Sequence, residues 1–115
     1  MTQVTRRGVG RHLFVRLALA AAIKFALGSV AAQAQEVKIT IDNFTFAPAE
    51  LTLKVGDSVT WTNHDDIPHT VVSAGKFRSK TLDSDDSYTY TFTAAGDYKY
   101  FCSLHPHMTG MIKVE

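Results

Sequence analysis

Four side chains of this sequence combine sulfur and imidazole donors that suit a soft metal ion. Cys102, His105 and Met108 follow one another at intervals of three residues, and His69 lies 33 residues before the cysteine. A thiolate and two imidazoles near one plane, with a thioether as a weak axial ligand, form the donor set of a type-1 copper site. The sequence therefore favours one copper ion as cofactor, with His69, Cys102, His105 and Met108 as candidate metal ligands.

Cys102 also has three other interpretations. It is the only cysteine, so it cannot form an internal disulfide, and it could be a buried, inert packing residue. It could pair with a histidine as a nucleophile, but nothing in the sequence suggests an oxyanion hole or a substrate cleft. Cysteine and histidine also suit zinc in a structural site. The neighbouring His105 and Met108 favour copper over these alternatives, and we expect that the protein is not an enzyme.

Two further histidines lie close to the candidate ligands in the sequence. His107 follows His105 by two positions. Met108 already supplies the soft axial donor. We therefore expect His107 to be a surface residue beside the site, and His64, which precedes two aspartates, to be an exposed loop residue.

The first 34 residues differ in composition from the rest of the chain. They contain five Lys or Arg and no Asp or Glu, with an apolar stretch over residues 13–27 and small residues before Ala34. This three-part pattern is typical of a secretory signal peptide, residues 1–34, cleaved after Ala34. Arg16 and Lys24 interrupt the apolar stretch, which argues against a permanent membrane anchor. We expect export to the periplasm, by the Sec or the twin-arginine route.

The remaining residues, 35–115, have the size of one small domain. They number 81 and contain seven Lys or Arg against eleven Asp or Glu, a net charge of −4 with neutral histidines. An acidic domain has no electrostatic reason to bind nucleic acid, which requires a basic face. The length leaves room for a single hydrophobic core.

Residues 35–115 carry the alternation of apolar and polar residues that is typical of strands. Seven segments show this pattern or a high content of aromatic and β-branched residues. They are residues 37–42, 51–55, 58–62, 69–73, 87–92, 96–102 and 111–115. Their spacing, without a long amphipathic helix, predicts an all-β antiparallel sandwich or barrel. Residues 102–110 are expected to form a loop between the last two strands.

Three long stretches of residues 36–115 are similar to a known family. The stretches "ITIDNFTFAPAEL", "VGDSVTWTNHDDIPHTVV" and "SYTYTFTAAGDYKYFCSLHPHMTGMIKVE" resemble the cupredoxins, and within them the amicyanin and plastocyanin-like group. The resemblance implies a single-domain Greek-key β-sandwich of about seven strands over residues 35–115. It also implies that His69, Cys102, His105 and Met108 are the copper ligands.

The same resemblance implies what the protein does. It implies a blue copper protein that shuttles single electrons between transient redox partners, a dehydrogenase or a cytochrome, and that is a monomer. It further implies that Asn63 ties the two ligand-bearing loops together through the backbone near Ser103. A periplasmic copper carrier or buffer, which would use the same ligands, stays open as the alternative.

Overall fold

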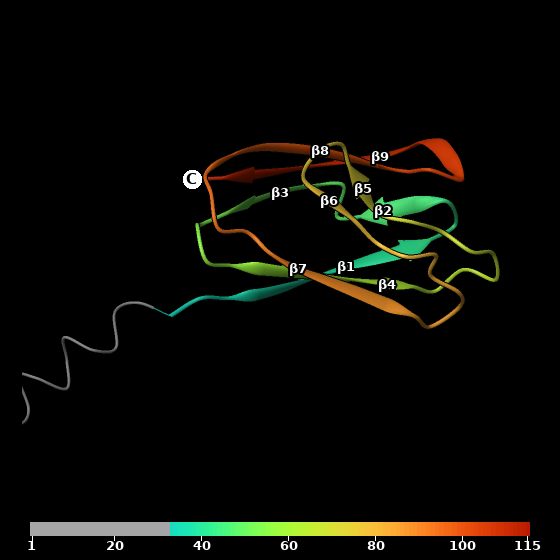
Figure 1. Ribbon diagram of the computed structural model, residues 1–115. Helices are drawn as coiled ribbons and strands as arrows, with labels where there is room; N and C mark the ends of the chain where they lie inside the picture. The colour runs from blue at the N-terminus through green and yellow to red at the C-terminus, as the bar shows by residue number, and fades with distance from the viewer. Residues whose placement is uncertain (1–32) are drawn as a thin grey trace, which may run out of the picture. The chain divides into compact units, whose positions relative to one another are not determined.

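The computed structural model describes residues 33–115, which form nine strands in two sheets. The strands are β1 (Glu36–Asp42), β2 (Thr45–Ala47), β3 (Glu50–Leu53), β4 (Ser58–Asn63), β5 (Val72–Ser73), β6 (Phe77–Arg78), β7 (Ser87–Thr91), β8 (Gly96–Cys102) and β9 (His105–Val114). One sheet has the order β2-β1-β4-β7 and the other β3-β9-β8-β5-β6. In Figure 1 the strands β3, β8 and β9 lie above β1, β4 and β7. Within residues 33–115 no helix is long and apolar enough to cross a membrane.

The core lies between the two sheets and is built from alternate residues of the strands. In β4, Val59, Trp61 and Asn63 are fully buried, while the residues between them are half-buried. The facing sheet contributes Tyr100 from β8 and Ile112 from β9 to the same buried cluster. Because alternate side chains of a strand point to opposite faces, each sheet presents one apolar face to the other. The predicted all-β sandwich is confirmed.

Two strand pairs run parallel, so the predicted antiparallel pairing is wrong for these two pairs. β1 pairs with β4 in parallel, and β3 pairs with β9 in parallel. Between the two strands of each pair, the chain leaves their sheet, forms at least one strand of the other sheet, and then returns. Residue alternation shows which face of a strand is buried, but it contains no information on the direction of the neighbouring strand.

The structure also has two strands that the sequence did not predict. β2 and β6 contain three and two residues, which is too short for an alternation pattern to be recognised. The predicted strand 69–73 shrinks to β5, and β3 ends at Leu53. Val55, the last residue of the predicted strand 51–55, therefore lies outside β3 and is 50 % exposed.

The pairing of β8 with β9 brings the cysteine and the nearby histidine to one end of the sandwich. β9 begins at His105, and the predicted loop 102–110 is reduced to a turn at Ser103 and Leu104. The pairing register shifts between Phe101 and Cys102, and such a bulge re-aims the side chains beside it. Figure 1 shows this turn at the end of the sandwich away from the C-terminus.

Candidate metal centre

Three of the four predicted ligands lie together at this end of the sandwich. The Sγ atom of Cys102 is 3.6 Å from Nδ1 of His69 and 3.7 Å from Nδ1 of His105. The ligand atoms of the three residues all lie within 4.8 Å of one another. One metal ion can therefore contact a thiolate and two imidazoles at the same time.

The four candidate ligands differ in their exposure. His69 and Cys102 are completely buried and Met108 is 4 % exposed, whereas His105 is half-buried. Met108 lies on β9 and belongs to the same buried cluster as Cys102. Sulfur donors that are shielded from water, together with two imidazoles, fit the preferences of copper, and the cluster is typical of a type-1 copper site.

The surroundings of Cys102 favour its metal-binding form. Burial alone raises the pKa of the thiol, but the N–H of Thr70 and the ring nitrogens of His69 and His105 outweigh it and lower the pKa to about 6. The Thr70 N–H lies 3.4 Å from Sγ. Because the thiolate is the form that binds metals, these contacts prepare the sulfur for a cation.

The side chain of Thr70 connects the two segments that carry the ligands. The N–H of Ser103 donates to Oγ1 of Thr70 at 2.7 Å, and the hydroxyl oxygens of the two residues are also 2.7 Å apart. The prediction that Asn63 makes this connection is wrong. Nδ2 of Asn63 donates instead to the carbonyl oxygens of Ile67 and Leu82, both at 2.9 Å. Asn63 thus connects the loop that leads to His69 with Leu82, the backbone partner of His69.

Asp65 contacts the buried histidine on the side away from the thiol, a contact that the sequence did not predict. Its Oδ2 lies 2.7 Å from Nε2 of His69. With the proton on Nε2, Nδ1 of His69 presents its lone pair toward Cys102. Burial raises the pKa of the Asp65 carboxyl, but hydrogen bonds from the N–H groups of Phe44 and Asn43 and from His69 hold it below its usual value. The sequence signal that could have indicated this contact was an acidic residue four positions before His69.

Phe44 is a second neighbour of the ligands that the sequence did not indicate. The centre of its ring is 5.5 Å from the ring of His69 and 5.0 Å from that of His105, edge-on in both cases. The side chain is 44 % exposed, so it covers the imidazoles from the solvent side. A single phenylalanine in a polar turn gives no sequence signal for such a contact.

The other two histidines behave as the sequence predicted. His107 is exposed on β9 and is not a member of the group that could hold a metal ion. His64 is exposed as well, and its Nδ1 lies 3.8 Å from a carboxylate oxygen of Asp85.

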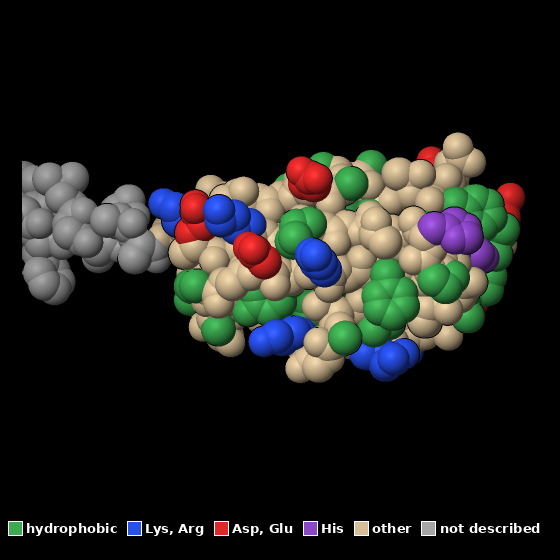
Figure 2. Space-filling view, turned by 90° about the horizontal axis from the view of Figure 1, so that it is seen from above, with side chains coloured by type: hydrophobic (Ala, Val, Ile, Leu, Met, Phe, Trp, Pro, Cys, Tyr) green, Lys and Arg blue, Asp and Glu red, His purple; other side chains and the backbone are tan. Residues whose placement is uncertain are grey.

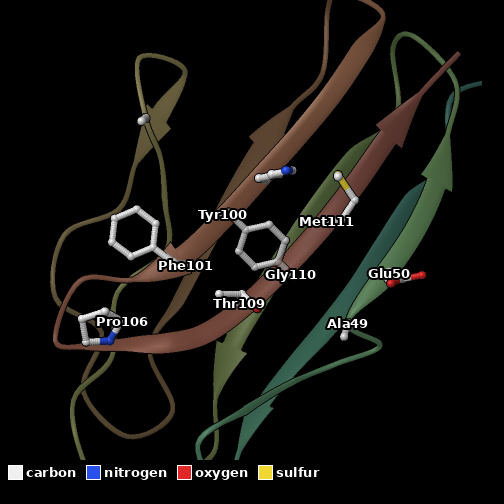
Figure 3. Close-up of a pocket in the computed structure, with 10 residues that line it drawn as sticks. Ala49, Glu50, Tyr100, Phe101, Pro106, Thr109, Gly110 and Met111 are labelled. Carbon is white, nitrogen blue, oxygen red and sulfur yellow. The ribbon is translucent and has the colours of Figure 1, made fainter.

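A pocket of about 650 Å³ lies beside the centre, along β8 and β9. Figure 3 shows Phe101, Pro106 and Met111 among the residues that line it. Phe101 and Pro106 are chain neighbours of Cys102 and His105, but the lining contains none of the four candidate ligands. The metal centre and the pocket are therefore separate features of this end of the molecule.

Comparison with known proteins agrees with this geometry. Residues 13–114 match the cupredoxin-like domain family. Amicyanin from Paracoccus versutus is 32 % identical, with 88 % of this chain and 96 % of that protein aligned. Chloroplast plastocyanin from Tetradesmus obliquus is 41 % identical, over 78 % of this chain and 73 % of that protein.

Solved structures with similar sequences share the fold. The reduced state of an amicyanin mutant has a TM-score of 0.67 and 34 % identity, over 70 % of this chain and 82 % of that one. A purple cupredoxin from Nitrosopumilus maritimus has a TM-score of 0.66 and 33 % identity, over 69 % of this chain and 99 % of that one. These relatives support the prediction that the protein is not an enzyme. The chain belongs to the cupredoxin family.

Proposed function

We propose that this chain is a periplasmic electron-transfer protein that shuttles single electrons between larger redox proteins. A bound copper ion would supply the one-electron chemistry by alternating between Cu(II) and Cu(I). The observation that carries the proposal is the position of one buried thiol sulfur, 3.6 and 3.7 Å from the Nδ1 atoms of His69 and His105. The similarity to amicyanin and plastocyanin supports it.

The four proposed ligands, His69, Cys102, His105 and Met108, have different parts in this function. Cys102 binds as the thiolate, and His69 binds through Nδ1 from a fully buried position. Met108 would supply a weak thioether donor, which would tune the potential. His105 is half-buried, so its ring connects the site to the molecular surface and is the proposed exit for the electron.

Apolar side chains around His105 form the proposed docking surface. Phe44, whose ring centre is 5.0 Å from that of His105, and Leu104, which precedes His105, are 44 % and 51 % exposed. Figure 2 shows histidine and hydrophobic side chains side by side at one end of the molecule. Weak electron-transfer complexes have small interfaces, so a compact apolar surface at the edge of the metal centre suits transient partners. We expect a dehydrogenase or a cytochrome as donor or acceptor.

The proposed location depends on the first residues of the chain. The signal-peptide pattern of residues 1–34 lies almost entirely outside the described residues, 33–115, and it stays a prediction. Export and cleavage after Ala34 would release residues 35–115 as a monomeric domain in the periplasm.

Addition of Cu(II) to the purified protein tests the metal site. We expect an intense thiolate-to-copper charge-transfer band in the wild-type protein, because a type-1 site binds copper through a thiolate. The variant Cys102→Ser should lack the band, and His64→Ala, at an exposed position, should keep it. A wild-type protein without the band, or a Cys102→Ser variant that retains it, would contradict the proposal.

Redox cycling separates the electron shuttle from a copper carrier or buffer. The shuttle should be reduced and reoxidised repeatedly while copper stays bound. A carrier should instead release copper each time it is reduced. Measurement of protein-bound copper after several cycles, with chelator present, decides between these functions.

A further inference from the structure

The turn between β1 and β2 contains a residue that is unusual for its backbone conformation. Asp42 and Thr45 pair with each other, which leaves Asn43 and Phe44 as the two turn residues. Their φ angles are 51° and 58°, both in the left-handed region. Asparagine suits the first position of such a turn, but the second position strongly favours glycine, and a bulky residue there is strained. Strain of this kind, when it is retained, indicates that the side chain has a function.

The Phe44 ring lies where it can hold both imidazoles. Its centre is 5.5 Å from the ring of His69 and 5.0 Å from that of His105, and both contacts are edge-on. The two imidazole rings are 4.9 Å apart. Phe44 therefore spans the pair on the solvent side and limits how far either ring can turn.

One carboxylate holds this turn and the buried ligand at the same time. Oδ1 of Asp65 accepts the N–H of Asn43 at 2.6 Å, and Oδ2 accepts the N–H of Phe44 at 3.0 Å. The same Oδ2 lies 2.7 Å from Nε2 of His69. The Asp65 side chain is only 12 % exposed and His69 is completely buried, so their contact is shielded from water, whereas the two bonds to the turn lie at the surface. Charge-assisted hydrogen bonds are also stronger than neutral ones.

The backbone of Asp65 is held by two hydrogen bonds, one at its N–H and one at its carbonyl oxygen. Its N–H donates to Oδ1 of the buried Asn63 at 2.9 Å. Its carbonyl oxygen accepts a hydrogen bond from the hydroxyl of Ser84. The carboxylate is thus a fixed point to which the β1–β2 turn is attached.

We propose that Asp65 and Phe44 are positioning residues that act as one unit on the copper ligands. Asp65 sets the orientation of His69 directly, and through the turn it sets the position of Phe44, whose ring restrains His69 and His105. This inference rests on the proposed copper site, and it adds the β1–β2 turn, which contains no ligand, to the metal centre.

The variant Asp65→Asn tests the carboxylate, with the exposed neighbour Asp66→Asn as the matched control. The amide keeps the size of the side chain but removes its charge. Partners of metal-binding histidines change metal affinity about 10- to 100-fold, so we expect a loss of that size in Cu(II) affinity. The reduction potential should rise, because the loss of a negative charge disfavours Cu(II). In the apoprotein, the Nε2–H proton resonance of His69 should move upfield and exchange faster with water. Asp66→Asn should leave all three properties unchanged.

The variant Phe44→Gly tests the ring, with the exposed Ile67→Ala as its control. Glycine suits this turn position, so the apoprotein should be at least as stable to urea as the wild type. Loss of the two aromatic contacts should weaken Cu(II) binding about two- to tenfold. If Phe44 only supported the fold, its loss would not raise the stability of the apoprotein while it lowered the affinity for Cu(II).

The outcomes separate the two proposals. If the wild-type protein shows no thiolate-to-copper band, the proposed function fails and this inference fails with it. If the band is present but Asp65→Asn matches Asp66→Asn in affinity, potential and proton resonance, only the positioning unit is wrong. Unchanged copper affinity in Phe44→Gly overturns it as well, even if Asp65→Asn does not fold.

Discussion

The two segments that bring ligands to the metal centre are held in place by different means. Segment 63–70 is tied down by buried side-chain hydrogen bonds, and both Asn63 and His69 in it are completely buried. Segment 102–108 is a turn and the start of a strand, in which Ser103, Leu104 and the residues 106–107 are exposed. Its position depends on the pairing of β8 with β9 and on the contact with Thr70.

This difference divides the centre into a fixed interior side and an accessible outer side. The interior side has many buried polar groups, and each of these must keep its partner because an unsatisfied buried group is costly. On the outer side, water can replace most contacts that are lost. Substitutions of the buried residues in segment 63–70 should therefore reduce stability, whereas most substitutions of exposed residues in segment 102–108 should affect only what the surface contacts.

The largest effect is expected for Asn63→Ala. Asn63 makes three hydrogen bonds with Ile67, Leu82 and Asp65, and alanine removes all three. At about 1 kcal/mol for each bond, the apoprotein should lose about 3 kcal/mol of its free energy of unfolding. Urea denaturation of the apoprotein measures this loss.

The adjacent residue provides the control for Asn63. His64 has a side chain that is 50 % exposed, and His64→Ala should change the free energy of unfolding by less than about 0.5 kcal/mol. Equal losses in the two variants would mean that segment 63–70 is not held by its buried hydrogen bonds.

A smaller effect is expected for Thr70→Val, which tests the link between the two segments. Valine has the shape of threonine but cannot accept the N–H of Ser103. Because Ser103 is exposed, water can partly replace the lost contact, and we expect a loss of about 1 kcal/mol. Thr60→Val, which removes a hydroxyl on the exposed face of the first sheet, should cost less in the same urea experiment. The reverse order would show that the two segments are positioned independently.

The fold could be predicted from sequence to the extent that it depends on one strand at a time. The alternation in residues 37–42 and 58–62 identified β1 and β4, with their buried faces, since burial is a property of each strand by itself. That these two strands are neighbours and run parallel depends on the path of the chain between them. The alternation pattern within either segment does not contain information on which strands are paired or in which direction they run.

The same limit applies to the metal centre. The ligand types and their spacing pointed to Cys102 and His105, because these residues are close in sequence and their donor chemistry is specific. Asp65, Thr70 and Phe44 are common residue types whose importance comes from contacts across the fold. The link assigned to Asn63 was wrong for this reason, since Asn63 and Thr70 both precede β5 and only their three-dimensional positions distinguish them.

The pH dependence of stability tests whether the interior side favours a thiolate. The pKa of Cys102 is about 6 in the folded protein against 9.0 for an unperturbed thiol. Between these values the unfolded chain binds more protons, so this group makes the stability of the apoprotein rise with pH. Its contribution is complete above about pH 9 and is lost as the pH falls through 6. The free energy of unfolding of Cys102→Ala, measured by urea denaturation across this range, should rise less steeply than that of the wild type. Parallel curves would contradict the lowered pKa.

The smallest effect is expected for His107→Ala, on the outer side. His107 is exposed on β9 and does not belong to the group of His69, Cys102 and His105 that could hold a metal ion. The free energy of unfolding of the apoprotein should change by less than about 0.5 kcal/mol, and the thiolate-to-copper band should stay at the same wavelength. His105→Ala should change that band strongly, because it removes a proposed ligand. A shifted band in His107→Ala would mean that this residue reaches the copper, and that the turn is less firmly fixed by the β8–β9 pairing than its register indicates.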